Sequence, residues 1–243
     1  MDTLEKHMNN HYSFYDMELL WSNEYRGWGN KTFLTDFISP MCQFIYRNNC
    51  NSDLLDLGCG DGNKSLIFTK LGFNVTGIDS SEERIKEARM NNRGSHFICQ
   101  KIDGVLPFSD NSFDVVFSCG FFQYITHEPI LKEIRRVLKP EGHFIFIENL
   151  KYNPITYIGR LLLKLIKFPY QSYPWNHFTV KKITAVQKSF HDSNIYFANL
   201  FTPLTQFFLF KKLYPFFRVI DKIFLPLFIK LSWLVMVTGK NNK

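Results

Sequence analysis

Short apolar runs alternate with mixed apolar and charged segments between residues 53 and 148. Continuous apolar runs of this kind are typical of strands that are buried on both faces of a parallel sheet. The pattern predicts strands over 54–57, 74–79, 96–99, 113–117 and 143–147. The intervening segments carry helix start and stop signals, which predict helices over 63–70, 81–90 and 129–138.

Strand and helix therefore alternate, and this order implies right-handed crossovers between parallel strands. We expect an α/β fold with a Rossmann-like, doubly wound sheet. Sheets of this type bind ligands beyond the carboxyl ends of their strands. The residues that directly follow the strands are therefore the first candidates for a functional site.

The pattern changes after residue 150. A basic amphipathic segment, 155–167, predicts an inserted helix, and Thr179 is placed to cap a helix that runs to Gln187. The segment 204–230 is apolar and basic and is broken by two prolines, so we expect two short helices packed on the sheet edge. Apolar runs at 194–200 and 234–238 predict the last strands. The expected sheet is mostly parallel, with an antiparallel edge strand near the C-terminus and helical cap elements.

Length and composition favour one globular domain. The chain has 243 residues, of which 45% are hydrophobic, 21% charged and 17% aromatic. We expect a single domain over 1–243, with an N-terminal lid or helices at 1–50, a ligand-binding core at 51–148 and a substrate cap with the final strands at 149–243.

The cysteines and the N-terminus bear on the compartment. The five cysteines contain no C-x-x-C pair, so the sequence indicates neither a disulfide framework nor a zinc site, and no metal site is expected. No signal peptide is predicted, because the N-terminus has no basic stretch followed by an apolar run. No transmembrane segment is predicted either, because the longest apolar window, 223–237, contains Pro226 and Lys230. We therefore expect a cytoplasmic protein.

Charge is distributed unevenly along the chain. Residues 1–148 hold 15 Lys/Arg and 20 Asp/Glu, whereas residues 149–243 hold 14 Lys/Arg and only Asp192 and Asp221. Such an excess indicates an anionic neighbour, such as a membrane surface, a phosphorylated substrate or nucleic acid. The alternative is that these lysines only solvate helices.

The sharpest motif is the glycine-rich turn 56–62, Asp-Leu-Gly-Cys-Gly-Asp-Gly, between a strand and a helix. Glycines allow a tight turn and a close backbone approach to a ligand, and the helix start offers free amides. A nucleotide-type cofactor is implied. Asn63 stands where both the dinucleotide fingerprint and the phosphate-binding loop need glycine. Asp56 would instead suit a cationic group of the ligand.

Four motifs follow one another in order: the turn 56–62, then 75–80, 106–117 and 133–142. Together they resemble the class I S-adenosylmethionine-dependent methyltransferases, in the broad branch that acts on small molecules. The resemblance covers residues 53–148, and Glu141 is a departure from the Pro-Gly-Gly usual in the family. It implies S-adenosylmethionine as cofactor and direct in-line transfer of the methyl group to an acceptor.

The resemblance also implies roles for individual residues. Asp79, followed by Ser80, should hold the ribose hydroxyls, although Asp79 could instead cap the next helix. Asp103 with Gly104 should meet the adenine, although this pair is also a common turn. The expected cofactor-binding residues are Asp56, Gly58, Cys59, Gly60, Asp79, Ser80, Asp103, Gly104 and Cys119.

Catalysis in this family needs little beyond positioning, and a general base is needed only where the acceptor must lose a proton. We expect Tyr124 and His127, just past the fourth strand, to be the catalytic residues that meet the acceptor. Packing in the core is the alternative role of Tyr124, and an exposed helix start that of His127. Cys119 is not expected to act as a nucleophile, because no activating partner is apparent.

Three functions stay open at this point. The first is methyl transfer to a small-molecule or lipid-linked acceptor, with the basic, aromatic C-terminal third at the inner face of an anionic membrane. The second is an RNA methyltransferase, which the apolar content of that third disfavours. The third is a binding protein that retains S-adenosylmethionine without transferring its methyl group. The acceptor and the oligomeric state do not follow from the sequence.

Overall fold

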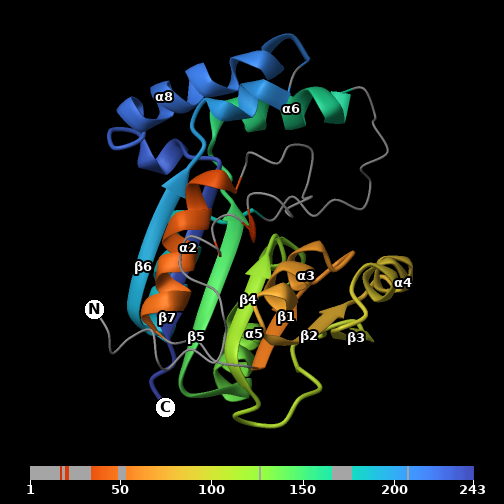
Figure 1. Ribbon diagram of the computed structural model, residues 1–243. Helices are drawn as coiled ribbons and strands as arrows, with labels where there is room; N and C mark the ends of the chain where they lie inside the picture. Colours follow the sequence, from red (N-terminus) through yellow and green to blue (C-terminus); the bar gives the residue numbers. More distant parts are fainter. Residues whose placement is uncertain are drawn as a thin grey trace, which may run out of the picture.

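The computed structural model describes residues 17, 20, 21, 34–48, 53–125, 127–165, 177–206 and 208–243. Its centre is a seven-stranded sheet in the order β3-β2-β1-β4-β5-β7-β6. Figure 1 shows helices on both faces of this sheet and a helical cap beyond the carboxyl ends of the strands. The strands are β1 (Asp53–Leu57), β2 (Asn74–Asp79), β3 (His96–Cys99), β4 (Phe113–Cys119), β5 (Leu138–Asn149), β6 (His191–Ala198) and β7 (Leu234–Lys240).

The expected mixed sheet is confirmed. The five strands from β1 to β5 are paired in parallel, and β7 pairs antiparallel with both β5 and β6. The strand that runs against the others is thus β7, one position in from the edge, and β6 forms the edge itself. The central parallel strands β1 and β4 are buried on both faces, as their continuous apolar sequences predict, whereas the edge strand β3 is partly exposed.

Two apolar cores lie on the two faces of the sheet. On one face, α2 (Thr35–Arg47) and α3 (Asn63–Lys70) pack around Trp21, whose ring lies 5.2 Å from that of Phe68. The helix α4 (Glu82–Asn91) lies beside α3 and covers β3. On the other face, α5 (His127–Val137) and α7 (Val180–Ser189) cover the apolar side chains of β4 and β5.

Local signals explain where the helices begin. The Ser81 hydroxyl accepts a hydrogen bond from the backbone amide of Arg84, and Thr179 caps α7 in the same way through the amide of Lys182. Ser81 therefore caps α4, not Asp79. The helix α3 begins after Gly62, whose positive φ of 73° suits glycine.

The cap consists of α6 (Pro154–Leu165), three short 3₁₀ segments and α8 (Tyr214–Phe224). The 3₁₀ segments are η2 (Thr202–Gln206), η3 (Phe208–Leu213) and η4 (Ile229–Leu231). We expected the segment 204–230 on the sheet edge, and this was wrong: α8 packs on η2 and η3, and Figure 1 shows it across the top of the molecule. Pro215 does not break a helix but lies in the first turn of α8, where a proline is tolerated.

Candidate functional site

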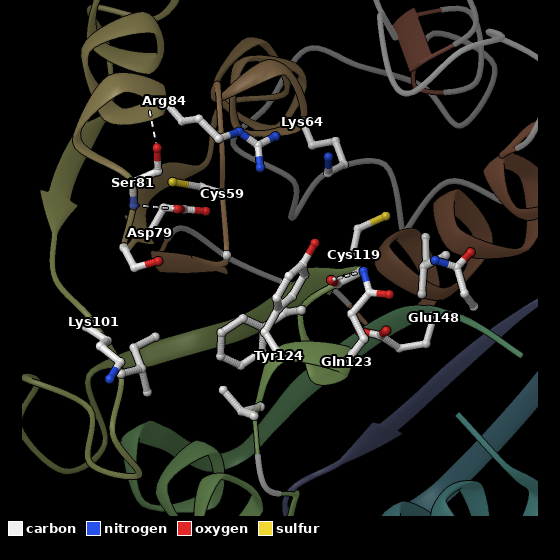
Figure 2. Close-up of a pocket in the computed structure, with 18 of the residues that line it drawn as sticks. Cys59, Lys64, Asp79, Ser81, Arg84, Lys101, Cys119, Gln123, Tyr124 and Glu148 are labelled. Atoms are coloured by element: carbon white, nitrogen blue, oxygen red, sulfur yellow. Dashed lines mark hydrogen bonds between the residues drawn. The ribbon is translucent and has the colours of Figure 1, made fainter. Parts of the chain in front are cut away.

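A cavity of about 780 Å³ opens at the carboxyl ends of the central strands, where a doubly wound sheet binds its ligands. Its walls come from the ends of β1, β2, β4 and β5, the first turns of α3 and α4, and η1 (Phe122–Tyr124). Trp233 and Leu234 close it from the side of the cap. Figure 2 shows the cavity with Lys64 and Arg84 on one side and Gln123 and Tyr124 on the other.

The glycine-rich turn forms one wall. The backbone amides of Gly58 and Cys59 both donate to the carbonyl of Ile78, which fixes the turn against the end of β2. Gly58 has φ 77°, and a Cβ there would lie 2.9 Å from the ring of Phe121. Glycine is therefore required at this position for conformation and for space. Gly58 and Cys59 line the cavity, whereas Gly60 is not among its lining residues.

Asp79 lies at the end of β2 with its carboxylate at the cavity wall. One oxygen accepts the amide of Gly60 at 3.0 Å, and the other accepts the amide of Ser81 at 2.9 Å. A carboxylate has about four acceptor positions, so the geometry leaves about two for a ligand. Asp79 thus holds the glycine turn to α4 and still offers acceptors to a pair of hydroxyl groups.

Asp56 is fully buried and does not line the cavity. The Ser65 hydroxyl donates to its Oδ2 at 2.6 Å, whereas Oδ1 has no hydrogen-bond partner within the described part of the chain. Burial raises the pKa of Asp56 to about 6. The structure therefore places this carboxylate behind the glycine turn, where it does not reach the cavity.

Cationic side chains line the cavity together with the carboxylates of Asp79 and Glu148. Lys64 in the first turn of α3 and Arg84 in the first turn of α4 both line the cavity. The Arg84 guanidinium crosses over Gly60, where an added Cβ would lie 2.5 Å from Nη2. The sequence analysis missed Lys64 and Arg84 as site residues, since each could equally be a solvated helix residue.

The loop after β4 forms the opposite wall. Gln123 is 6% exposed, and its Nε2 donates to the carbonyl of Gly120 while its Oε1 is without a partner among the described residues. Tyr124 is 56% exposed and lines the cavity mouth, and burial of its hydroxyl raises its pKa. Burial also raises the pKa of the Cys119 thiol to about 11, so this side chain stays protonated near neutral pH.

Glu148 is a site residue that the sequence analysis did not single out. It is 2% exposed at the end of β5, lines the cavity, and accepts the backbone amide of Phe122 at 2.9 Å. Burial raises its pKa to about 8, while the amide of Phe122 acts in the opposite direction. An acidic residue at the end of an apolar strand was the available signal, but its partner lies 26 residues away in sequence.

Other expected residues are placed differently. Asp103 is exposed and pairs with Lys101 at 3.1 Å, and neither Asp103 nor Gly104 lines the cavity, whereas the neighbouring Ile102 does. Ser80 lines it, as expected. His127 begins α5, but its side chain lies outside the described residues, as does most of the N-terminal segment 1–50.

Comparison with known proteins identifies a domain in this chain. Residues 55–146 match the family model described as a methyltransferase domain. The chain is 34% identical over 109 residues to sterol 4-C-methyltransferase of Caenorhabditis elegans, which covers 42% of this chain and 33% of that protein. It is 31% identical over 111 residues to demethylmenaquinone methyltransferase of Thermotoga maritima, covering 44% of this chain and 48% of that protein. Residues 55–146 therefore form a methyltransferase domain similar to those of the class I S-adenosylmethionine-dependent methyltransferases.

Solved methyltransferase structures share this fold. Phosphoethanolamine N-methyltransferase 2 of Haemonchus contortus in complex with S-adenosyl-L-methionine superimposes with a TM-score of 0.59 at 16% identity. The match covers 100% of this chain and 61% of that one. A methyltransferase from Methanosarcina mazei gives a TM-score of 0.54 at 21% identity over 79% of this chain and 93% of that one. The chain spans about a third to a half of the length of the two curated relatives named above.

The cofactor of this family is S-adenosylmethionine, and the cavity suits it. That molecule carries two ribose hydroxyls, an ammonium, a carboxylate and a sulfonium charge. The cavity offers the free acceptor positions of Asp79, the unpartnered carbonyl oxygen of Gln123 and the cations Lys64 and Arg84. A mixed set of acceptors and cations fits a ligand that carries both charges better than a polyphosphate, because acceptor carboxylates repel an anion.

Proposed function

We propose that this protein transfers a methyl group from S-adenosylmethionine to a small-molecule or lipid-linked acceptor by direct in-line displacement. The observation that carries the proposal is the meeting of the glycine turn and Asp79 at one cavity, in a chain of this family. The cofactor-binding residues that we propose are those of the sequence analysis that reach this cavity, together with Lys64 and Arg84.

The chemistry that S-adenosylmethionine supplies when bound is a methyl group on a positively charged sulfur, which a nucleophile can displace. The chain itself has to bind, orient and exclude water. Asp79 would hold the ribose, and Lys64 or Arg84 would pair with the carboxylate end. Cys119 and Gly120, at the end of β4, would lie beside the reacting centre without taking part in bond formation, because the Cys119 thiol stays protonated.

Positioning of the acceptor is the proposed role of the β4 loop. Tyr124 keeps its proton at neutral pH, since burial raises its pKa, and would therefore donate a hydrogen bond to the acceptor. Glu148, with a pKa of about 8, would accept a proton only above that pH or after binding of a cation beside it. His127 remains a proposal from the sequence for an acceptor that must lose a proton.

Titration calorimetry with S-adenosylhomocysteine tests cofactor binding. Replacing Asp79 with alanine should weaken binding about tenfold or more, because a charge-assisted hydrogen bond is lost. Glu83→Ala, an exposed change in the first turn of α4, serves as the matched control. Equal affinities of the wild-type protein and Asp79→Ala would contradict the proposed ribose contact.

Acceptor class is tested by transfer of a labelled methyl group into a cell extract split into lipid and aqueous fractions. Label in either fraction that depends on intact Asp79 supports the proposal and gives the acceptor class. Binding of S-adenosylhomocysteine with no label in any small-molecule fraction would contradict it. Label in RNA would instead support the alternative raised by the basic C-terminal third.

A further inference from the structure

The cap carries exposed apolar side chains that have no role in the cavity. On α6, Tyr157, Leu161 and Leu165 follow one another at helical spacing and are 49–71% exposed. Ile158 and Leu162 form the adjacent row and are also more than half exposed. A helix on the surface of a globular domain normally turns such a stripe inward. Here α6 presents it outward.

The helix α8 repeats this arrangement. Phe216, Val219 and Ile223 are spaced along one side of the helix and are 57–61% exposed. The stripe continues beyond the end of the helix with Leu227, which is 74% exposed, and Phe228. We call these residues of α8, together with the two rows of α6, the cap stripe.

Both helices are fixed in one cap. The segment η2 contacts α6 and α8, and Figure 1 shows both helices at the same end of the molecule. The buried carboxylate of Asp221 in α8 accepts the backbone amides of Leu200 and Thr202. The side chain of Asn153, just before α6, donates to the carbonyls of Leu200 and Leu231. The helices that carry the exposed stripe are therefore anchored by buried hydrogen bonds.

The unpaired charges around the stripe, among the described residues, are of one sign, because Asp36 of α2 is neutralised by Arg218 of α8 at 2.8 Å. Lys164 on α6, Lys222 on α8, and Lys212 and Lys230 beside α8 are exposed. The one acidic residue in the sequences of the two helices is Asp221, which is buried and bound to backbone amides. Asp192 is at the start of β6, at the opposite end of the sheet.

We infer that the cap stripe docks onto an anionic membrane surface. Apolar residues flanked by lysines, with no unpaired carboxylate among the described residues of α6 and α8, are what an amphipathic helix in the plane of a lipid interface requires. None of the helices in the described part of the chain combines the length and apolar composition that a bilayer crossing requires, so the contact is peripheral. A symmetric dimer through this face would bring its lysines together without counter-charges, whereas anionic lipid headgroups neutralise them.

The docking face lies next to the cavity. Asn149 and Trp233 line the cavity. The chain runs from Asn149 into α6, and η4 comes shortly before Trp233. Only a few residues of chain separate these cavity residues from the cap, so a membrane contact of the cap would hold the cavity near the lipid interface. This inference goes beyond the proposed reaction, since the stripe makes no contact that methyl transfer requires.

Co-sedimentation with vesicles tests the inference. We expect the protein to bind vesicles that contain phosphatidylglycerol, to bind phosphatidylcholine vesicles much more weakly, and to be released by high salt. Replacing Lys164 and Lys222 with glutamine should lower the partition constant about fivefold for each lysine. Replacing Leu161 and Ile223 with serine should lower it about tenfold or more.

Matched controls keep the result interpretable. Met90→Ser removes an exposed apolar side chain and Lys132→Gln an exposed cation, both outside the cap, and neither should change vesicle binding. Affinity for S-adenosylhomocysteine, measured on every variant, reports whether the fold and the cavity are intact and is independent of the vesicle result. Equal binding to neutral and anionic vesicles, or full binding by the Leu161 and Ile223 variant, would overturn the inference. So would a dimer in solution that this variant dissociates.

Discussion

The carboxylate of Glu148 accepts a hydrogen bond from the backbone amide of Phe122 at 2.9 Å, which joins the end of β5 to the loop after β4. Both residues are buried, with Glu148 at the cavity wall. The same loop carries Gln123 and Tyr124 into the cavity. A buried carboxylate therefore helps to fix the loop that forms this wall of the cavity.

Glu148→Ala should destabilise the protein by about 1–3 kcal/mol, because the buried amide of Phe122 loses its partner. Turnover should fall with it, since the loop that carries Tyr124 loses its anchor. Glu148→Gln keeps an acceptor at this position and serves as the control. Urea denaturation of both variants measures the effect, and equal stability of the two would show that the hydrogen bond does not hold the loop.

The pH dependence of stability gives a second test of Glu148. Its pKa is raised to about 8 by burial, so the folded protein keeps a proton that the unfolded chain loses near the ordinary value of 4.5. The stabilisation that this bound proton contributes is complete below the pKa of Glu148 in the unfolded chain. It is lost as the pH rises through the pKa of Glu148 in the folded protein. Lys182 acts against this shift, and the amide of Phe122 does so more strongly.

We therefore expect the free energy of unfolding of Glu148→Gln, relative to wild type, to rise between pH 5 and pH 8 by about 1.4 kcal/mol per pH unit. The difference between the two proteins is measured because Asp56, His143 and His177 also titrate abnormally and contribute to each curve alone. Parallel stability curves over this range would show that Glu148 titrates normally.

Two glycines should respond in opposite ways to alanine. Gly58→Ala should destabilise the protein by about 2 kcal/mol or more, since a left-handed residue gains a side chain and meets the Phe121 ring. Gly159→Ala lies within α6, where a Cβ would meet nothing within 4 Å, and should stabilise by up to about 1 kcal/mol. Thermal unfolding of the two variants compares them directly. A stabilising effect of Gly58→Ala would mean that the turn does not need this glycine.

The strands, and the meeting of Gly58 and Asp79 at one cavity, were predictable from the sequence because they depend on local signals. Buried parallel strands are continuous apolar runs, and the ends of β1 and β2 carry Gly58 and Asp79 at recognisable spacing. The cap was not predictable to the same degree. Amphipathic segments such as 214–224 fit a sheet edge as well as a surface, and only tertiary packing on η2 and η3 decides between them.

The other residues of the cavity wall were predictable only in part, for a related reason. Tyr124 was identified from its place after β4, but Glu148 contacts the loop through Phe122, and Arg84 reaches Gly60 from another helix. Such pairs are set by the sheet order and leave no periodic pattern in the chain. Asp103 shows the opposite case, because a matching motif lies at the expected place while its carboxylate pairs with Lys101 in solvent.

Asp103→Ala should accordingly weaken binding of S-adenosylhomocysteine less than Asp79→Ala does. The carboxylate of Asp103 is 73% exposed and paired with Lys101, and exposed pairs contribute little to stability. We expect a change of about threefold or less, with no loss of stability. A loss as large as that of Asp79→Ala, measured by the same calorimetry, would show that Asp103 leaves Lys101 and contacts the adenine when the cofactor binds.

Tyr124→Phe separates acceptor positioning from cofactor binding. Tyr124 lines the cavity mouth and keeps its proton at neutral pH, so removal of its hydroxyl takes away a hydrogen-bond donor to the acceptor. We expect turnover to fall about threefold to tenfold while the affinity for S-adenosylhomocysteine stays unchanged. Tyr152→Phe is the matched control, because Tyr152 is similarly exposed and does not line the cavity. Equal turnover of Tyr124→Phe and the wild-type protein would leave Tyr124 with a packing role, since its ring is retained in the variant.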